Sequence, residues 1–92
     1  ALSGLVKSVA LDLSSQEIFV NAVLPGVIDT PMTRGVLTEK QVLSVGERTN
    51  FGRLVEPREL ANVIFFLCSD LNSCITGQSI VADLGFANVR PI

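Results

Sequence analysis

The sequence has no histidine, tyrosine or tryptophan, and only two of its 92 residues are cysteine. Without histidine, Cys68 and Cys74 lack the partners that complete a tetrahedral zinc site, so we expect no metal site. Two cysteines in an intracellular domain are more often free thiols than a disulfide. We therefore expect both thiols to be free and buried, in a protein of the reducing cytoplasm.

Charge and long apolar runs are also scarce. The formal net charge is −2, and the seven Lys and Arg residues form no cluster, which argues against a nucleic-acid-binding surface. No apolar run reaches the ~18 residues of a membrane-spanning helix, and the first residues do not resemble a signal peptide. We expect a chain that binds neither nucleic acid nor membrane. Its start within a helical pattern, without an initiator Met, suggests a segment cut from a longer protein.

The chain is instead rich in apolar residues. Hydrophobic residues make up 48% of the sequence and charged residues 17%, against a usual charged fraction of ~25%. A chain of this length buries a modest share of its surface and is marginally stable alone. One interpretation is a well-packed small domain. We favour a piece of a larger body or a subunit of a tight oligomer.

Apolar periodicity predicts a helix followed by a strand. Residues 2–13 place apolar side chains along one helical face. Residues 18–24 then form a continuous, β-branched-rich run, which is typical of a strand buried on both faces of a parallel sheet. Pro25-Gly26 ends the run. Asn21 lies inside it, and because a buried amide needs partners, we expect a neighbouring loop to supply them.

The segment over residues 31–52 is polar and Thr- and Gly-rich, and it predicts a mobile excursion outside the core. Within it, Thr38 and Gln41 have the spacing of a capping box, which favours a short helix over residues 38–48.

The last part of the chain predicts a second helix and strand. Pro57 suits the first turn of a helix over residues 57–68 that is apolar nearly all round and therefore buried on more than one side. Residues 79–82 predict a strand, and residues 83–92 a coil. Two strands joined by a helical crossover should be parallel and the crossover right-handed. Two strands alone make a poor sheet, so both need neighbours from outside this chain.

An ordered set of motifs runs from residue 1 to about residue 86. The motifs are Gly4-Leu5-Val6-Lys7-Ser8-Val9-Ala10, Val20-Asn21-Ala22-Val23-Leu24-Pro25-Gly26-Val27-Ile28-Asp29-Thr30-Pro31-Met32, Gly52-Arg53-Leu54, Pro57-x-Glu59-Leu60-Ala61, Phe66-Leu67, Ser69-Asp70, Ser73 and Ile75-Thr76-Gly77-Gln78. A lone Pro-Gly pair would carry no weight. In this order and spacing, the motifs resemble the short-chain dehydrogenase/reductase family, with a pattern like that of 3-oxoacyl-ACP reductases.

The resemblance implies an α/β fold: the C-terminal portion of a Rossmann-type doubly wound parallel sheet, in the order helix, strand, lid helices, helix, strand. Residues 1–92 would be the C-terminal fragment of a single NAD(P)-binding domain, completed by a missing N-terminal part of the same fold. The whole protein would use NAD or NADP to transfer hydride to or from a small carbonyl or alcohol substrate.

The resemblance places no catalytic residue in this chain. The family's catalytic serine belongs on an earlier strand, and its Tyr-x-x-x-Lys pair should end just ahead of Ala1. Lys7 is not that lysine, because its tyrosine would then fall at position 3, which is Ser3. We therefore expect the chain alone to be inactive, since it lacks the phenol that performs the acid–base chemistry.

By the resemblance, the cofactor-binding residues are Pro25, Gly26, Val27, Ile28, Thr30 and Met32. Ligands bind at the carboxyl ends of strands in open α/β sheets. Gly26 would let the flat nicotinamide ring approach the backbone, and Ile28 would offer its backbone N–H and C=O to the carboxamide. The Thr30 hydroxyl would bond the carboxamide or a phosphate. Without the family pattern, Pro25-Gly26 would be only a turn and Thr30 only a helix cap.

Residues 31–52 correspond to the family's substrate lid. Apolar residues of this segment either line a substrate pocket or form the inner face of the lid, and the sequence does not choose between these: Met32, Val36, Leu37 and Leu43. Two positions depart from the family pattern. Leu84 replaces a glycine, which puts the backbone there in doubt, and Asn50 stands where proline is common.

The resemblance also implies a homo-oligomer, a dimer or tetramer, assembled through the helix before the first strand, the helix over residues 57–68 and the last strand. The alternative function is a non-catalytic interaction module that docks its two strands on a partner's sheet. The mass of the native protein separates the two hypotheses, because a module would have a mass near 9.8 kDa and an enzyme subunit would be much larger.

Overall fold

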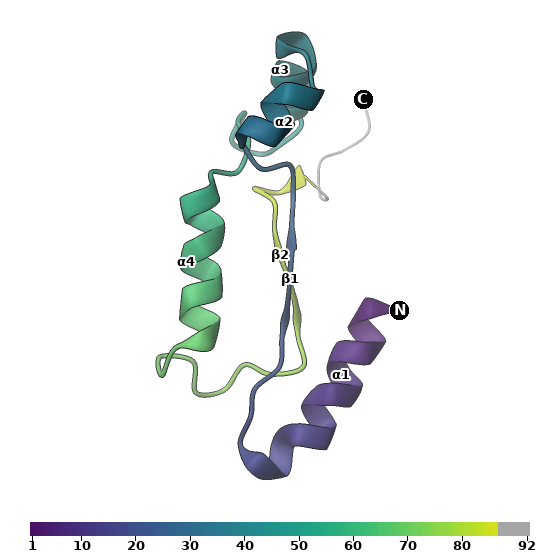
Figure 1. The fold of residues 1–92 in the computed structure, drawn as a ribbon, viewed down its shortest axis with the longest axis vertical. Coiled ribbons are helices and arrows are strands. Elements are labelled where there is room, and N and C mark those ends of the chain that lie inside the picture. Colours follow the sequence, from purple (N-terminus) through teal and green to yellow (C-terminus); the bar gives the residue numbers. More distant parts are fainter. Residues whose placement is uncertain (87–92) are drawn as a thin grey trace.

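Two parallel strands form the centre of the structure (Figure 1). This computed structural model describes residues 1–86, and the part of the predicted coil over residues 87–92 lies outside them. The elements are α1 (Leu2–Leu13), a 3-10 turn (Ser14–Gln16), β1 (Ala22–Pro25), α2 (Pro31–Val36), α3 (Glu39–Glu47), α4 (Pro57–Cys68) and β2 (Ser79–Ala82). The predicted first and last helices and second strand are confirmed with their bounds.

The parallel pairing of β1 and β2 is confirmed. The register places Ala22 opposite Ser79 and Pro25 opposite Ala82. Figure 1 shows α4 on one side of the two strands and α1 on the other, while α2 and α3 lie beyond the carboxyl ends of the strands. Helices on both sides of a parallel sheet are the arrangement of a doubly wound α/β fold.

The predicted first strand is too long at its start. β1 begins at Ala22, and residues 18–21 lie outside it. The turn before β2 holds Val20 instead, because the Val20 N–H donates to Thr76 Oγ1 at 3.0 Å and the Gly77 N–H donates to the Val20 C=O at 2.7 Å. Since a side-chain hydroxyl takes the place of a backbone carbonyl here, the regular ladder starts only at Ala22.

Asn21 is satisfied by the loop that precedes β2, as predicted. Its Nδ2 donates to the Ile75 C=O at 3.0 Å, and its Oδ1 accepts from the Gln78 N–H at 3.1 Å. The Asn21 side chain thereby takes the place of two backbone hydrogen bonds and holds the starts of β1 and β2 together.

The segment over residues 31–52 folds into α2 and α3, so its expected place outside the core is wrong in part. The predicted capping box is confirmed: Thr38 Oγ1 accepts from the Gln41 N–H at 3.1 Å, and Gln41 Oε1 accepts from the Thr38 N–H at 2.9 Å. Val42 and Thr49 are buried. The polar composition of the segment did not predict this burial. Thr49 can be buried because nearby backbone groups satisfy its hydroxyl.

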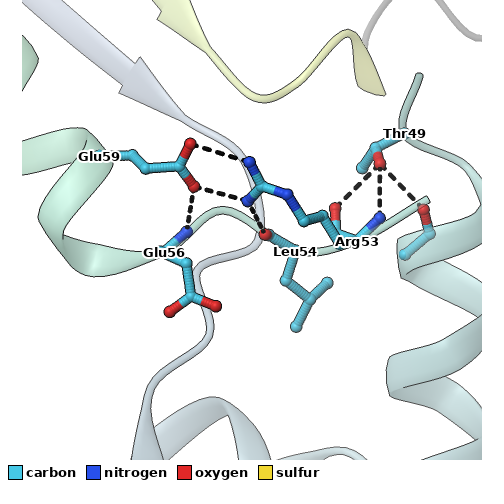
Figure 2. A network of polar contacts seen from close by, with 6 residues as sticks. Thr49, Arg53, Leu54, Glu56 and Glu59 are labelled. Atoms are coloured by element: carbon cyan, nitrogen blue, oxygen red, sulfur yellow. Dashed lines mark hydrogen bonds and ion pairs between the residues drawn. The ribbon is translucent and has the colours of Figure 1, made fainter. Parts of the chain in front are cut away.

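Figure 2 shows how Thr49 and Arg53 connect this segment to α4. Thr49 Oγ1 lies 2.9 Å from the carbonyl oxygens of both Gly46 and Arg53, and accepts from the Arg53 N–H at 3.1 Å. The Arg53 guanidinium makes a two-point ion pair with Glu59, at 2.6 Å and 3.0 Å. Glu59 also accepts from the Glu56 N–H at 3.0 Å at the start of α4. One carboxylate thus fixes both the helix start and the arginine.

Much apolar surface is left uncovered. The accessible area is 6768 Å², against about 5200 Å² for a compact monomer of this mass. The radius of gyration is 15.7 Å, against about 12 Å for a compact domain of this length. Within residues 1–86 the expected two-sided burial of α4 is not met, since Leu67 alone of its residues is buried. The apolar faces therefore lack the covering layer that such a fold requires.

Both cysteines are free, as predicted, but they are exposed, and the expectation of burial was wrong. Cys68 ends α4, and Cys74 lies in the turn before β2. Cys68 also lines an open cleft of about 850 Å³ beside β1 and α4. Its exposure follows from the uncovered side of α4.

Leu84 has φ 55°, in the left-handed region that favours glycine. The backbone therefore keeps a glycine-like conformation at this departure from the family pattern, despite the strain that a leucine meets there.

Gly26 provides a test of the junction between the two strands. A Cβ at this position would lie 2.8 Å from Asp83 Cβ and 3.1 Å from Asp83 Cα. We predict that Gly26→Ala lowers the free energy of unfolding by ~1–3 kcal/mol through overpacking. Gly35→Ala in α2 is the control, because nothing lies within 4 Å of that site, and it should be neutral or stabilising. Equal urea-unfolding curves for the two variants would contradict the close contact.

Glu59 provides a test of the network in Figure 2. The Arg53 guanidinium, followed by the Glu56 N–H, lowers the pKa of Glu59 from 4.5 to about 2. A folded-state pKa below the unfolded one stabilises the protein above the unfolded pKa, and this contribution is lost as pH falls from 4.5 toward 2. We predict that Glu59→Gln lowers the thermal midpoint at pH 7, and that the difference from wild type shrinks with acidification. Glu47→Gln is the surface control, and a constant difference for Glu59→Gln across this range would refute the ion pair.

Candidate functional site

The backbone after β1 continues alongside the segment that precedes α4. The Val55 N–H donates to the Val27 C=O at 3.2 Å, and the Asp29 N–H donates to the Val55 C=O at 2.8 Å. These bonds form an isolated parallel bridge between Ile28 and Val55. Residues 26–30, which we call the edge strip, are therefore held extended at the carboxyl end of the sheet.

The bridge leaves the backbone of Ile28 available to a ligand. In a parallel bridge the residues on either side of the central one bond the partner, and the central residue's own N–H and C=O point the other way. Within residues 1–86 the Ile28 N–H and C=O make no hydrogen bond. A half-buried donor and acceptor side by side are suited to a planar amide, which presents one acceptor and one donor group.

Gly26 opens the edge strip, and its N–H donates to the Ala82 C=O at 3.3 Å. Its missing side chain makes room for Asp83, as the distances above show. The role expected for this glycine from the sequence, the close approach of a flat ring, stays a prediction. Pro25 is exposed at the end of β1, where its lack of an N–H costs no ladder bond, and Val27 is half-buried.

Thr30 is the N-cap of α2. Its Oγ1 accepts from the Thr33 N–H at 3.1 Å and donates to Thr33 Oγ1 at 3.1 Å. A hydroxyl has one proton and two lone pairs, so one lone pair remains for a further donor. Thr30 Oγ1 can therefore cap α2 and still accept one more hydrogen bond. To donate to a phosphate, the Thr30 hydroxyl would first have to break its bond to Thr33.

Asp29 and Arg34 form a two-point ion pair across the start of α2, at 2.8 Å and 3.0 Å. The Arg34 hydrogen bond lowers the pKa of Asp29, and the same bond raises that of Arg34. Sequence reasoning did not find this pair. An acidic residue just ahead of a Pro-initiated helix, with arginine in its first turns, was the available signal. The pair fixes the turn between the edge strip and α2.

Three of the four predicted lid residues are exposed. Met32 is 80% exposed, Val36 77% and Leu43 66%, and Leu37 caps the end of α2. Leu43 lines a small cleft of about 180 Å³ together with Arg34 and Leu54. Among the described residues, therefore, Met32, Val36 and Leu43 are exposed, while Leu37 is half-buried.

Two larger clefts lie elsewhere. The cleft of about 850 Å³ borders the start of β1 and the end of α4, and one of about 340 Å³ lies between α4 and β2. Neither includes the edge strip. In the described part of the chain no cluster of His, Cys, Asp and Glu is arranged for a metal ion, and no helix has the length and apolar character to cross a bilayer.

Sequence comparisons identify known proteins that are similar to this chain. The family model of the enoyl-(acyl carrier protein) reductases matches residues 1–87. The chain is 47% identical over 79 residues to the 3-oxoacyl-(acyl-carrier-protein) reductase of Aquifex aeolicus, covering 86% of this chain and 32% of that protein. It is 46% identical to the Thermotoga maritima enzyme of that name, covering 89% of this chain and 33% of that protein. The chain spans about a third of the length of these curated relatives.

Two solved structures have the same fold over nearly all of this chain. A 4-hydroxyisoleucine dehydrogenase complexed with NADH superposes with a TM-score of 0.86 at 29% identity, covering 97% of this chain and 37% of that chain. ElxO with NADP bound superposes with a TM-score of 0.84 at 28% identity, covering 96% of this chain and 36% of that chain. The fold is the corresponding part of a Rossmann-type sheet, as the sequence predicted. This chain belongs to the short-chain dehydrogenase/reductase family and is similar to its 3-oxoacyl-(acyl-carrier-protein) reductases.

Proposed function

We propose that the edge strip binds the nicotinamide end of NAD or NADP in an oxidoreductase of this family. The observation that carries the proposal is the unused N–H and C=O of Ile28 at the carboxyl end of a parallel strand. Ligands of open α/β sheets bind at this edge. The NADH and NADP in the two similar structures support a nicotinamide cofactor, without choosing between its forms.

The donor and acceptor set of the edge strip fits a carboxamide. The Ile28 N–H donates to the carboxamide oxygen, the Ile28 C=O accepts from its amino group, and Thr30 Oγ1 offers its remaining lone pair to that group. Pro25, Gly26, Val27 and Met32 flank these contacts. Fixing the amide fixes which face of the ring meets the substrate. When bound, the nicotinamide supplies or accepts the hydride that interconverts a carbonyl and an alcohol.

The proton-transfer groups lie outside this chain in the proposal. The sequence contains no tyrosine, so the acid–base phenol, with its serine and lysine, would come from the part of the protein that the relatives have and this chain does not. Residues 1–92 are then the C-terminal fragment of one cofactor-binding domain and are inactive alone. The mass of the native subunit tests this assignment against the interaction-module alternative.

We assign a neighbour to each of the uncovered surfaces. The rest of the fold extends the sheet beyond β1 and fills the large cleft beside α4. The outer face of α4, where Phe65 is 70% exposed and Ile64 45% exposed, contacts a second copy in a dimer or tetramer. Residues 31–52 form the substrate lid, and Met32, Val36, Leu37 and Leu43 face the apolar part of a small carbonyl or alcohol substrate.

Thr30 tests the carboxamide contact. Thr30→Val, in the full-length protein, removes one acceptor for the amino group and should raise the dissociation constant of NADH or NADPH by roughly 3- to 10-fold, the usual value of one hydrogen bond. Titration of the nicotinamide fluorescence measures this change. Thr30→Ser keeps the acceptor and should bind like wild type.

Thr38→Val is the matched control for this prediction. Thr38 caps α3 as Thr30 caps α2, accepting from the N–H three residues on at 3.1 Å. Both variants therefore lose a cap of similar energy, but only the Thr30 variant should lose cofactor affinity. An equal loss of affinity in both would reduce Thr30 to a helix cap.

A further inference from the structure

The end of the lid meets the turn after β2 at three points. The Asn50 N–H donates to the Leu84 C=O at 2.8 Å. The Asn50 side-chain amide packs against Gly85, where an added Cβ would overlap it. The Arg48 guanidinium lies 5.2 Å from the centroid of the Phe86 ring, within the range of a cation–π contact. Residues separated by more than thirty positions in the sequence are thereby joined.

The turn over residues 83–86 is closed by its own hydrogen bonds. The Gly85 N–H donates to Asp83 Oδ1 at 2.8 Å, and the Phe86 N–H donates to the Asp83 C=O at 3.2 Å. Leu84 and Gly85 both have positive φ, 55° and 84°.

The same turn lies directly against the edge strip. Asp83 occupies the space that a side chain at Gly26 would fill, and Gly26 bonds Ala82. The turn is therefore in contact with the lid on one side, through Asn50, and with the edge strip on the other, through Asp83. Within the described chain, the segment that follows α3 has a second link to the rest of the fold, because Thr49 bonds Arg53 and the Arg53 guanidinium pairs with Glu59 of α4 (Figure 2).

We propose that Asn50 is a positioning residue that sets the lid over the edge strip through the turn at residues 83–86. The inference rests on the proposed function, because the lid and the strip matter together only if substrate and nicotinamide meet between them. The backbone N–H is the essential group. Every residue except proline carries a backbone N–H. The side chain at position 50 therefore matters less than the backbone N–H.

The first test separates the lid from the cofactor site kinetically. In the full-length protein, with ethyl acetoacetate as a small 3-oxo ester probe, Asn50→Pro should raise KM about 5-fold, the effect of one lost hydrogen bond. The dissociation constant of NADPH or NADH should change less than about 2-fold, because the edge strip itself is intact. Asn50→Ala keeps the N–H and should remain near wild type. Equal losses in cofactor affinity and KM for Asn50→Pro would overturn the proposal.

A second pair of variants addresses the cation–π contact and guards against misfolding of the proline variant. Arg48→Gln should raise KM in the same direction as Asn50→Pro, and Arg48→Lys should recover it, because the cation over Phe86 is restored. Thermal midpoints of all variants are measured alongside. If KM changes among the variants in step with the thermal midpoint, and does not depend on whether position 48 carries a cation, the contact is structural only. That result would overturn the positioning role of Asn50.

Hydrogen exchange tests the connection without relying on activity. The Asn50 amide should exchange slowly in wild type and faster in Arg48→Gln, since the Leu84 C=O protects it. Exchange of this amide at the rate of an unprotected one would overturn the inference. Slow exchange in a protein that binds neither NADH nor NADPH would instead contradict the proposed function and leave the connection itself supported.

Discussion

The pairing of β1 with β2 is the interaction on which the other contacts depend. Its register brings Pro25 beside Ala82, so the next residue, Gly26, meets Asp83 with no room for a side chain. The chain then continues extended along Val55, which turns the Ile28 amide groups outward. A shift of one residue in this register would reverse every side chain of the strip and would bury the groups proposed to hold the carboxamide.

The pairing cannot be the whole source of stability. Two strands of four residues make a sheet that is marginal by itself, and the accessible area of 6768 Å² exceeds that of a compact monomer of this mass. The exposed side of α4, the exposed cysteines and the large cleft all belong to surface that the described residues leave uncovered, in a chain that spans about a third of the length of the curated relatives it matches. The exposed side chains are consequently no guide to a ligand by themselves.

The sequence predicted the parts whose signals are local. Helical periodicity gave α1, a capping box gave α3, and proline gave the start of α4. It failed where a partner distant in the sequence decides the structure. Val20 leaves the strand because Thr76, 56 positions away, bonds it. The burial of Thr49 was missed for a different reason: nearby backbone carbonyls of Gly46 and Arg53 satisfy its hydroxyl, and polar composition does not reveal this. The Asn50 contact uses a backbone N–H, which no residue pattern reveals. The sharp end of the strand at Pro25-Gly26 suggested a binding edge, and the family resemblance assigned its residues to the cofactor.

A crystal structure of the full-length protein with NADH or NADPH tests the central claim most directly. We expect the carboxamide oxygen and amino group each to lie about 3 Å from the backbone of Ile28, within hydrogen-bonding distance, with Gly26 and Thr30 beside the ring. A carboxamide bound elsewhere, or Ile28 backbone groups that bond another part of the protein while the cofactor is in place, would refute the proposed site.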